Sequence, residues 1–342
     1  MDSGETWEQV ITPLLTIDKS IFALKEYNGV LYASVQSLGI LTSQNLGQSW
    51  KSFYVFGNYG SILVDGDNIY IANRNTSGIS VSNNSGGTWT ELAGGIGNAF
   101  ISALTKYNNK IYAGGNDKLF ESSDNGQTWL EINIPDIQSY GINSMLGDVS
   151  GLYITIDHTV QVASGNLDDW EIVFEGDFIQ RMGKIGENIF LPTFSKYYIG
   201  SSPQYDWQVE ELPNFTGTVW DIEEVNGKTI LATSKGILVR EANTNQWMSK
   251  NTGLNGLLVN DMGSYQDQLL AGTSSGLRIY NPTENAWSSV LGQFPENNQL
   301  DIRDVEVVGG RVIVSTGQTL YSYDFLNAGN WKLEVELGYR TN

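Results

Sequence analysis

Nine tryptophans recur along the chain at nearly constant spacing, with 37 to 44 residues from each one to the next. They are Trp7, Trp50, Trp89, Trp129, Trp170, Trp207, Trp247, Trp287 and Trp331. A tenth tryptophan, Trp220, lies outside the series. A fixed period of about 40 residues is typical of repeat proteins, in which each unit buries its apolar face only by packing against its neighbours. Because the repeat runs through the whole of residues 1–342, it predicts a single domain of about eight repeats.

Each repeat contains a short run rich in Val, Ile, Leu and Tyr, with apolar residues at consecutive positions. The runs lie at residues 30–33, 69–72, 111–113, 152–154, 189–191, 230–232, 269–271 and 312–314. Consecutive apolar residues in a strand indicate burial on both of its faces. Radially packed antiparallel sheets bury their middle strands in this way. We therefore predict an all-β fold, a single β-propeller of four-stranded antiparallel blades, with eight blades favoured and seven as the alternative.

The loops that precede the early tryptophans share a motif. Residues 122–129 contain Ser122, Asp124, Gly126 and Trp129 in the pattern Ser-x-Asp-x-Gly-x-Thr-Trp. Two further copies have Asn in place of Asp, and a fourth lacks its first residues: Ser43, Asn45, Gly47 and Trp50; Ser82, Asn84, Gly86 and Trp89; Asp2, Gly4 and Trp7. An Asp or Asn side chain can accept backbone N–H bonds in such a turn, Gly tolerates positive φ, and Trp can cover the hairpin base.

This motif resembles the Asp-box hairpin of BNR-type propellers, a class that includes sialidases and photosystem assembly factors. The resemblance implies a structural role for the motif residues. The later repeats lose the motif, and residues 251–254, 259–262 and 271–277 are instead similar to the propeller repeats of two-component regulators. Both families build four-stranded blades. The nine tryptophan-led strands exceed the eight three-strand sets by one, so the strand at Trp7 is expected to complete the last blade or to lie beside it.

The first strands of the repeats align to give one column of equivalent residues near the entrance of the axial channel. The column reads Ala23, Ile62, Ala103, Ser144, Arg181, Asp221, Asp261 and Asp304. Neighbouring carboxylates raise one another's pKa, and they suit acid/base chemistry or a hard cation. Asp221, Asp261 and Asp304 are therefore the candidate catalytic or ligand-binding residues. The alternative is that Asp stabilises a turn that sister repeats have inherited.

Three further residues are candidates for ligand binding. Trp220 directly precedes Asp221 and could stack on a sugar ring while the acid binds hydroxyls, although packing between blades is the competing interpretation. Arg181 belongs to the column, and His158 is expected on the same face. His158 is the only histidine, so no His-rich metal site is possible, and the chain has no Gly-x-Ser-x-Gly elbow. We predict no metal and no cofactor.

Charge and composition restrict the partners. The chain has 19 Lys and Arg against 38 Asp and Glu, a net charge of −19, which disfavours nucleic acid and anionic membranes. No apolar run reaches the roughly 18 to 20 residues that a membrane span needs, and there is no cysteine. We expect a monomer that is secreted or located in the bacterial periplasm or cell envelope, with a signal sequence upstream of Met1.

The distribution of arginines argues against sialidase activity. The resemblance implies an early Arg-Ile-Pro motif and three arginines around a carboxylate, but no such motif occurs and the first half of the chain contains only Arg74. Photosystem assembly factors of the class imply a chaperone or scaffold role. The sequence therefore predicts a non-enzymatic module that binds a protein or glycan at the channel entrance. The alternative is a glycoside hydrolase that uses the carboxylates of the column.

Overall fold

The computed structural model describes most of the chain. The described ranges are 21–35, 39–53, 59–73, 78–92, 95–97, 99–116, 118–134, 141–165, 167–179, 182–185, 188–194, 196–201, 207–212, 215, 217–240, 246–254, 258–265, 268–289, 301–316, 319–324 and 332–336. Within these ranges the regular structure is entirely β.

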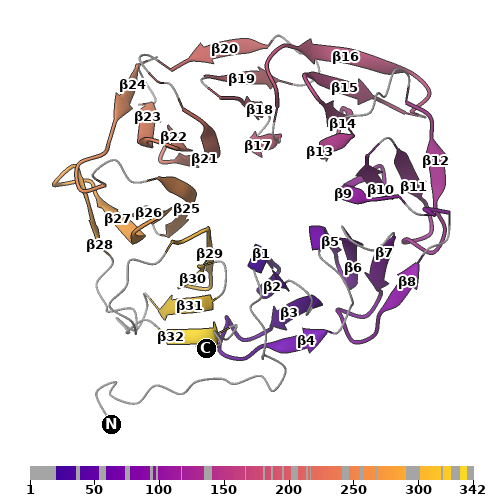
Figure 1. Ribbon diagram of the computed structural model, residues 1–342, viewed down its shortest axis with the longest axis horizontal. Helices are drawn as coiled ribbons and strands as arrows, with labels where there is room; N and C mark the ends of the chain where they lie inside the picture. Colours follow the sequence, from indigo (N-terminus) through magenta and orange to yellow (C-terminus); the bar gives the residue numbers. More distant parts are fainter. Residues whose placement is uncertain are drawn as a thin grey trace, which may run out of the picture. The chain divides into compact units, whose positions relative to one another are not determined.

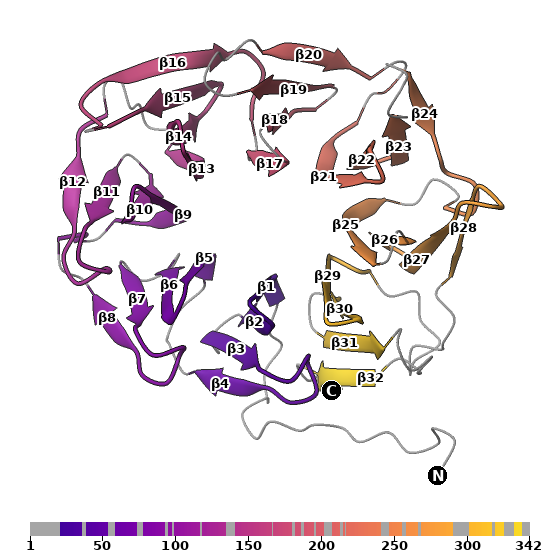
Figure 2. The same ribbon diagram turned by 180° about the vertical axis from the view of Figure 1, so that it is seen from behind.

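The strands form eight four-stranded antiparallel sheets, and each sheet takes four strands that are consecutive in the sequence (Figure 1, Figure 2). This confirms the prediction of an eight-bladed β-propeller, and we number the sheets as blades 1 to 8 in chain order. Blades 1 to 4 contain β1 (Ile21–Tyr27), β2 (Val30–Val35), β3 (Gly39–Ser43), β4 (Lys51–Phe53), β5 (Tyr59–Asp65), β6 (Asn68–Asn73), β7 (Ile79–Ser82), β8 (Thr90–Leu92), β9 (Ile101–Tyr107), β10 (Lys110–Gly115), β11 (Leu119–Ser122), β12 (Leu130–Ile132), β13 (Ile142–Asp148), β14 (Gly151–Ile156), β15 (Thr159–Ala163) and β16 (Trp170–Glu175).

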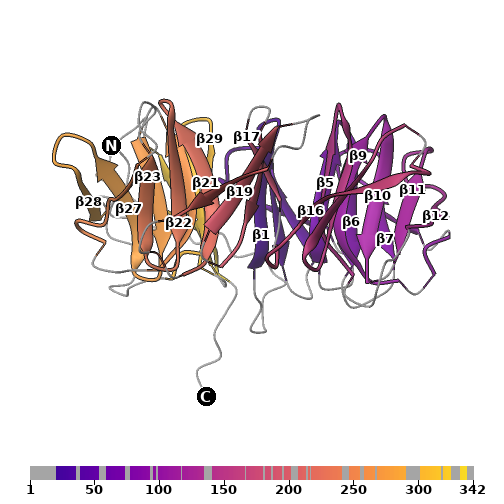
Figure 3. The same cartoon turned by 90° about the horizontal axis from the view of Figure 1, so that it is seen from above.

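Blades 5 to 8 follow the same order. They contain β17 (Gly183–Ile185), β18 (Asn188–Pro192), β19 (Lys196–Ser201), β20 (Gln208–Glu211), β21 (Val219–Val225), β22 (Lys228–Thr233), β23 (Gly236–Arg240), β24 (Trp247–Ser249), β25 (Val259–Tyr265), β26 (Gln268–Thr273), β27 (Gly276–Asn281), β28 (Ala286–Ser289), β29 (Asp304–Val308), β30 (Arg311–Ser315), β31 (Thr319–Asp324) and β32 (Lys332–Glu336). Within a blade the strands lie side by side in sequence order, as for β9, β10, β11 and β12 (Figure 1; Figure 3 gives a view turned by 90°).

The blades group into two compact units. The first unit holds most of blade 1 together with blades 6, 7 and 8, and the second holds blades 2 to 5. In the first unit, β21 packs against β25, β25 against β29, and β29 against β1. In the second unit, β5 packs against β9 and β9 against β13. The first strands of blades 6, 7, 8 and 1 are thus neighbours in the first unit, and those of blades 2, 3 and 4 in the second.

The core consists of apolar layers between adjacent blades. All six residues of β14 are buried, as expected for a middle strand that is covered on both faces. One layer joins Tyr70 and Val81 of blade 2 to Leu104 and Phe120 of blade 3. Equivalent layers join blades 3 and 4, 4 and 5, 6 and 7, and 7 and 8. Because each layer belongs to two blades, a blade is stabilised mainly by its neighbours.

Tryptophans of the series pack in these apolar layers. Trp129 stands before the fourth strand of blade 3 and packs in the layer shared with blade 2, and Trp287 of blade 7 packs in the layer shared with blade 6. Both are buried. Trp7 and Trp331 lie outside the described residues, as does the expected extra strand at Trp7. Blade 8 takes its fourth strand, β32, from its own repeat.

The hairpin between β11 and β12 shows how the motif of the early repeats works. Ser122 Oγ accepts the N–H of Gly126 at 2.8 Å, and Asp124 Oδ1 accepts both the Ser122 hydroxyl at 2.8 Å and the N–H of Thr128 at 2.9 Å. The Thr128 hydroxyl donates to Asp124 Oδ2 at 2.6 Å, and the hydrogen bonds to the carboxylate lower its pKa to about 2. The carboxylate is therefore bonded to its own turn.

The copies in blades 1 and 2 repeat this arrangement with an amide. Asn45 Oδ1 accepts the N–H of Ser49 and Asn84 Oδ1 accepts the N–H of Thr88, each at 2.8 Å. The glycine takes a positive φ in all three hairpins, with values of 83° at Gly47, 85° at Gly86 and 84° at Gly126. The incomplete copy at Asp2 and Gly4 lies outside the described residues.

Candidate functional site

The backbone register decides which residues share the column on the first strands. Asp221 pairs with Ala232, Asp261 with Gly272 and Asp304 with Ser315, and these partners occupy the same position in their second strands. The other described members are Ala23, Ser61, Ala103 and Ser144. The three aspartates thus belong to blades 6, 7 and 8, which are consecutive in the first unit.

One assignment in the predicted column is wrong. Ser61, and not Ile62, holds the blade 2 position, because Ser61 pairs with Ala72 while Ile62 pairs with Ile71. The tight turn that follows Asp65 sets this register, whereas the apolar pattern of the strand fits either alignment. Arg181, the expected blade 5 member, lies outside the described residues.

Two aspartates of the column hold the first strand of the next blade. Asp221 Oδ2 accepts the N–H of Met262 at 3.2 Å, and Asp261 Oδ2 accepts the N–H of Val305 at 2.7 Å. Ser144 does the same in the second unit, where its Oγ accepts the N–H of Met182 at 3.1 Å. A polar residue at this position therefore links consecutive blades.

Asp304, the last of the three aspartates, makes its hydrogen bond within its own blade. Its Oδ2 accepts the hydroxyl of Ser315, on the second strand of the same blade, at 2.5 Å. Burial, with the charges of Asp221 and Asp304 on either side, raises the pKa of Asp261 well above its usual range, although the Val305 N–H opposes the shift. The three carboxylates thus act on one another electrostatically.

A second row of charged residues lies two positions further along the same strands. Glu223 on β21 and Glu306 on β29 follow Asp221 and Asp304, and Lys25 holds the equivalent position on β1. Residues two apart in a strand point to the same face, so both rows lie on one face of these strands. Lys25 Nζ lies 3.4 Å from Glu306 Oε1. Sequence reasoning missed this row, although the spacing of two was visible.

Burial raises the pKa values of the two glutamates in the second row. The pKa of Glu223 is raised to about 7, first by burial and then by the negative charges of Asp221 and Glu306. Burial also raises the pKa of Glu306. Among the described residues, Lys25 is the cation that opposes the shifts at Glu223, Asp261 and Glu306. We call the set Asp221, Glu223, Asp261, Asp304 and Glu306 the acidic face.

Trp220 directly precedes Asp221 of the acidic face in the chain. About 37% of its surface is accessible, so it is not among the fully buried residues of the layers between blades. It lies at the register shift between Val219 and Asp221, where one extra residue enters β21. At the corresponding position of blade 7, Asn260 donates to the carbonyl of Ile302 at 2.7 Å. Trp220 thus presents an aromatic surface to solvent.

His158 lies in the second unit, in the turn between β14 and β15. Its Nε2 is 3.4 Å from Asp157 Oδ1, and its ring meets Phe178 edge to face at 5.9 Å between centroids. Asp177 lies near it and bonds to Lys196 at 3.0 Å. His158 thus belongs to the second unit, whereas the acidic face belongs to the first.

The described residues contain no group of three or more His, Cys, Asp or Glu side chains arranged to hold a metal ion. Nor does any described segment form a helix with the length and hydropathy needed to span a bilayer. The described carboxylates of the acidic face thus do not converge as ligands of one ion, although their negative charge attracts cations.

The sequence matches known proteins over only part of its length. A family model described as the DUF6242 beta propeller domain matches residues 58–172, about a third of the chain. A comparison with curated proteins found no match.

Many solved structures share the fold. The computationally designed Ika8 protein is 10% identical with a TM-score of 0.68, and the match covers 90% of this chain and 97% of that one. The structure of YCF48 bound to D1 peptide is 11% identical with a TM-score of 0.58, covering 78% and 92%. The extracellular domain of the putative hybrid two component system BT4673 from B. thetaiotaomicron is 8% identical with a TM-score of 0.55, covering 93% of this chain and 59% of that chain. At these identities the likeness concerns the fold alone.

Proposed function

We propose that the chain is a non-enzymatic binding module that recognises a basic peptide segment of a protein partner at the acidic face. The observation that carries this proposal is the excess of negative charge on β21, β25 and β29. The five carboxylates of the acidic face lie there, and Lys25 is the cation that opposes the pKa shifts of three of them, Glu223, Asp261 and Glu306. Burial and then repulsion raise the pKa values of Glu223, Asp261 and Glu306, and a ligand that brings Lys or Arg side chains would relieve that repulsion.

The hydrogen bonds of the column favour binding over catalysis. A general acid or base must be able to reach the reacting atom. Asp221 and Asp261 each hold a backbone N–H of the next blade, so moving either carboxylate would break a link between blades. The second row, Glu223 and Glu306, is where a ligand would contribute most charge compensation.

Trp220 supports the same proposal. It lies next to Asp221 and is exposed, and exposed tryptophans are enriched among residues that contribute most to protein interfaces. We propose that Trp220 serves as an aromatic anchor next to the charged groups of the acidic face. A structural neighbour, YCF48, has been solved with a bound peptide, which agrees with a peptide ligand for this fold.

The proposal extends to class and location. The bonded hairpins at Ser43, Ser82 and Ser122 support membership of the Asp-box class, with structural motif residues. A neighbour that is an extracellular domain supports a secreted or cell-envelope protein. We further propose that the chain is one domain and acts as a monomer without a cofactor.

A peptide library tests the function. Soluble chain would be screened by fluorescence polarisation against peptides of basic, neutral and acidic composition, with a glycan library in parallel. We expect basic peptides to bind, with affinity that falls as salt rises. Glu223→Gln with Glu306→Gln should weaken binding roughly tenfold or more, which corresponds to about 1.4 kcal/mol. The matched control is Glu171→Gln with Glu175→Gln, which removes two exposed charges on β16. Equal loss in both double variants, or binding of glycans alone, would reject the proposal.

A glycoside hydrolase is the second candidate, and one observation favours it. Glu223 has its pKa raised to about 7 beside the carboxylate of Asp221, as a general acid of such an enzyme requires. The test is release of reducing sugar from a panel of polysaccharides. Hydrolysis by the parent chain that disappears in Glu223→Gln, with folding unchanged, would replace the binding proposal by this one.

A further inference from the structure

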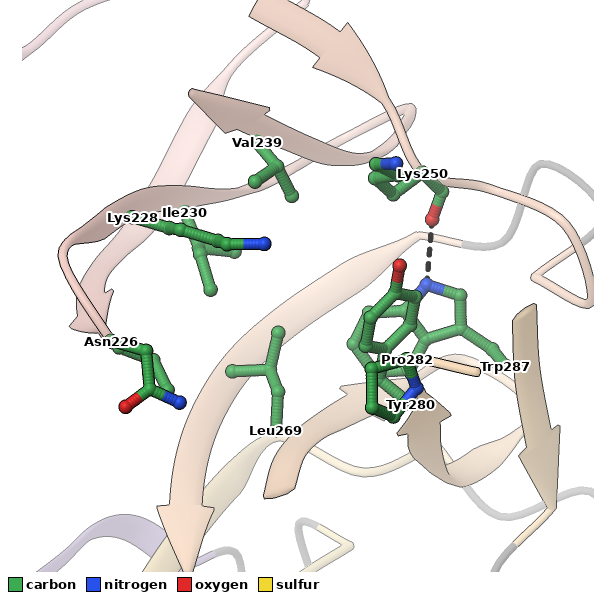
Figure 4. Close-up of a pocket in the computed structure, with 10 residues that line it drawn as sticks. Asn226, Lys228, Ile230, Val239, Lys250, Leu269, Tyr280, Pro282 and Trp287 are labelled. Carbon is green, nitrogen blue, oxygen red and sulfur yellow. Dashed lines mark hydrogen bonds between the residues drawn. The ribbon is translucent and has the colours of Figure 1, made fainter. Parts of the chain in front are cut away.

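A cavity of about 170 Å³ opens between blades 6 and 7 of the first unit (Figure 4). It lies at the end of β21 that turns into β22, where Val225 and Asn226 line it. Glu223, the member of the acidic face nearest to it on this strand, stands two residues before Val225, roughly 7 Å at the rise of a β-strand. No residue of the acidic face is among those that line the cavity.

The wall of the cavity is made of core residues. Ile230, Val239, Leu269 and Trp287 all line it, and all belong to the buried layer between blades 6 and 7. Tyr280 packs against this layer from the side, with its ring 5.1 Å from that of Trp287. The apolar layer thus has an opening to solvent at this end, whose lining is aliphatic and aromatic.

The rim of the cavity is cationic and held by hydrogen bonds. Lys228 and Lys250 both line it, and Figure 4 shows the Lys228 ammonium extending across the cavity from β22. Asn285 Oδ1 accepts the Lys250 ammonium at 2.8 Å and the Tyr280 hydroxyl at 2.7 Å. The Trp287 indole N–H donates to the carbonyl of Lys250 at 2.6 Å. These bonds fix one lysine and both aromatic rings before any ligand arrives.

We infer that this cavity binds a small organic carboxylate that carries one aromatic ring or branched aliphatic group. An apolar cavity of about 150 Å³ accommodates benzene, so the space matches a single ring or a group of similar size. Its lining excludes a fully polar ligand. Two lysines that line one cavity are a concentration of positive charge in a chain of net charge −19, and they complement the carboxylate of a bound ligand.

The inference does not depend on the proposed peptide site. The acidic face would bind a cationic partner through carboxylates, whereas this cavity would bind an anion through ammonium groups and apolar walls. Loss of peptide binding at the acidic face would therefore leave carboxylate binding in the cavity unchanged, and the reverse also holds.

The probes are 3-phenylpropionate and its neutral analogue 3-phenyl-1-propanol. Binding to the full chain would be measured by ligand-observed saturation-transfer NMR and titration at low salt. We expect the acid to bind with a dissociation constant of about a millimolar, as its size allows, and the alcohol to bind at least roughly tenfold more weakly. Equal binding of the two probes, or no binding of the acid at about 20 mM, would overturn the inference.

Variants locate the site. Lys228→Gln with Lys250→Gln should weaken binding of the acid roughly tenfold and leave that of the alcohol unchanged. Leu269→Phe should weaken both probes because it fills the cavity. The matched control is Lys235→Gln, an exposed lysine in the turn between β22 and β23. If a variant melts early, the single Lys228→Gln change replaces it. Unchanged acid binding in the lysine variants, or equal loss in the control, would show that the carboxylate is not recognised here.

Discussion

The Oδ2 atom of Asp261 accepts the backbone N–H of Val305 at 2.7 Å and so ties the first strand of blade 7 to that of blade 8. The link has an electrostatic cost, because the carboxylate is partly buried and lies between Asp221 and Asp304. The position therefore needs an acceptor oxygen more than it needs a charge.

This predicts opposite effects for two substitutions. Asp261→Ala leaves the Val305 N–H without its acceptor and should lower the free energy of unfolding by about 1 to 3 kcal/mol. Asp261→Asn keeps an oxygen acceptor and removes the repulsion, so its stability should equal or exceed that of the parent chain at pH 8. Urea unfolding followed by tryptophan fluorescence measures both. An Asn variant as unstable as the Ala variant would mean that the charge itself is required.

The raised pKa of Glu223 predicts a pH dependence of stability. Its ordinary value is 4.5 and its folded value is about 7, so the folded chain binds more protons than the unfolded chain between these pH values. Stability should therefore fall as the pH rises from about 4.5 to about 7 and then level off. After allowance for solvent screening we expect a loss of about 1 to 2 kcal/mol from this group.

Glu223→Gln isolates this contribution. The Gln side chain does not titrate, so the variant should show a flatter stability profile between pH 4.5 and 7 and a higher urea midpoint than the parent at pH 8. The carboxyl of Asp124 has a lowered pKa of about 2 and acts only at lower pH, outside this window. A parent profile that rises across the window would contradict the assignment.

The repeat period and the two-faced apolar strands were enough to predict the blades, because both depend on local pattern alone. The column of aspartates was also visible, since Asp221, Asp261 and Asp304 occupy equivalent places in their repeats. The hydrogen bonds that these aspartates make to the next blade could not be predicted. A bond such as that from the Val305 N–H to Asp261 depends on how neighbouring blades are oriented. Ile62 was misplaced because Ile62, Leu63 and Val64 are apolar at consecutive positions, so this strand has no alternation that would fix its register.

The cavity could not be predicted for a related reason. Its lining comes from residues spread between Val225 and Trp287, and no local motif joins them. Lys228 and Lys250 look like ordinary surface lysines in the sequence. They line one cavity only because blades 6 and 7 pack against each other. Glu223 and Glu306, by contrast, were detectable from their spacing of two after each aspartate.

Gly126 is predicted to be required for stability, both because its φ is positive and because a Cβ there would meet neighbouring side chains. Gly66 is a control that shares only the positive φ. The φ of Gly126 is +84°, and a Cβ there would lie 3.0 Å from both Tyr70 and Val81 of blade 2. Gly66 has a φ of +62° with nothing within 4 Å of a Cβ. Gly66→Ala should thus cost about 1 kcal/mol from backbone strain alone, and Gly126→Ala should cost more, about 2 to 4 kcal/mol. Equal losses in thermal or urea unfolding would mean that the Tyr70 contact adds nothing.

Substitution of Trp220 should affect ligand binding, whereas substitution of Trp129 should affect the stability of the fold. Trp129 is buried, and its indole N–H donates to the carbonyl of Gly126 at 3.1 Å, so Trp129→Ala should destabilise the chain by about 3 to 5 kcal/mol. Trp220 is exposed, so Trp220→Ala should change stability by less than about 1 kcal/mol while weakening basic-peptide binding roughly tenfold. Calorimetric melting and fluorescence polarisation on the same preparations give both quantities. If Trp220→Ala melted as early as Trp129→Ala, the tryptophan outside the series would belong to the core, and the proposed aromatic anchor would be wrong.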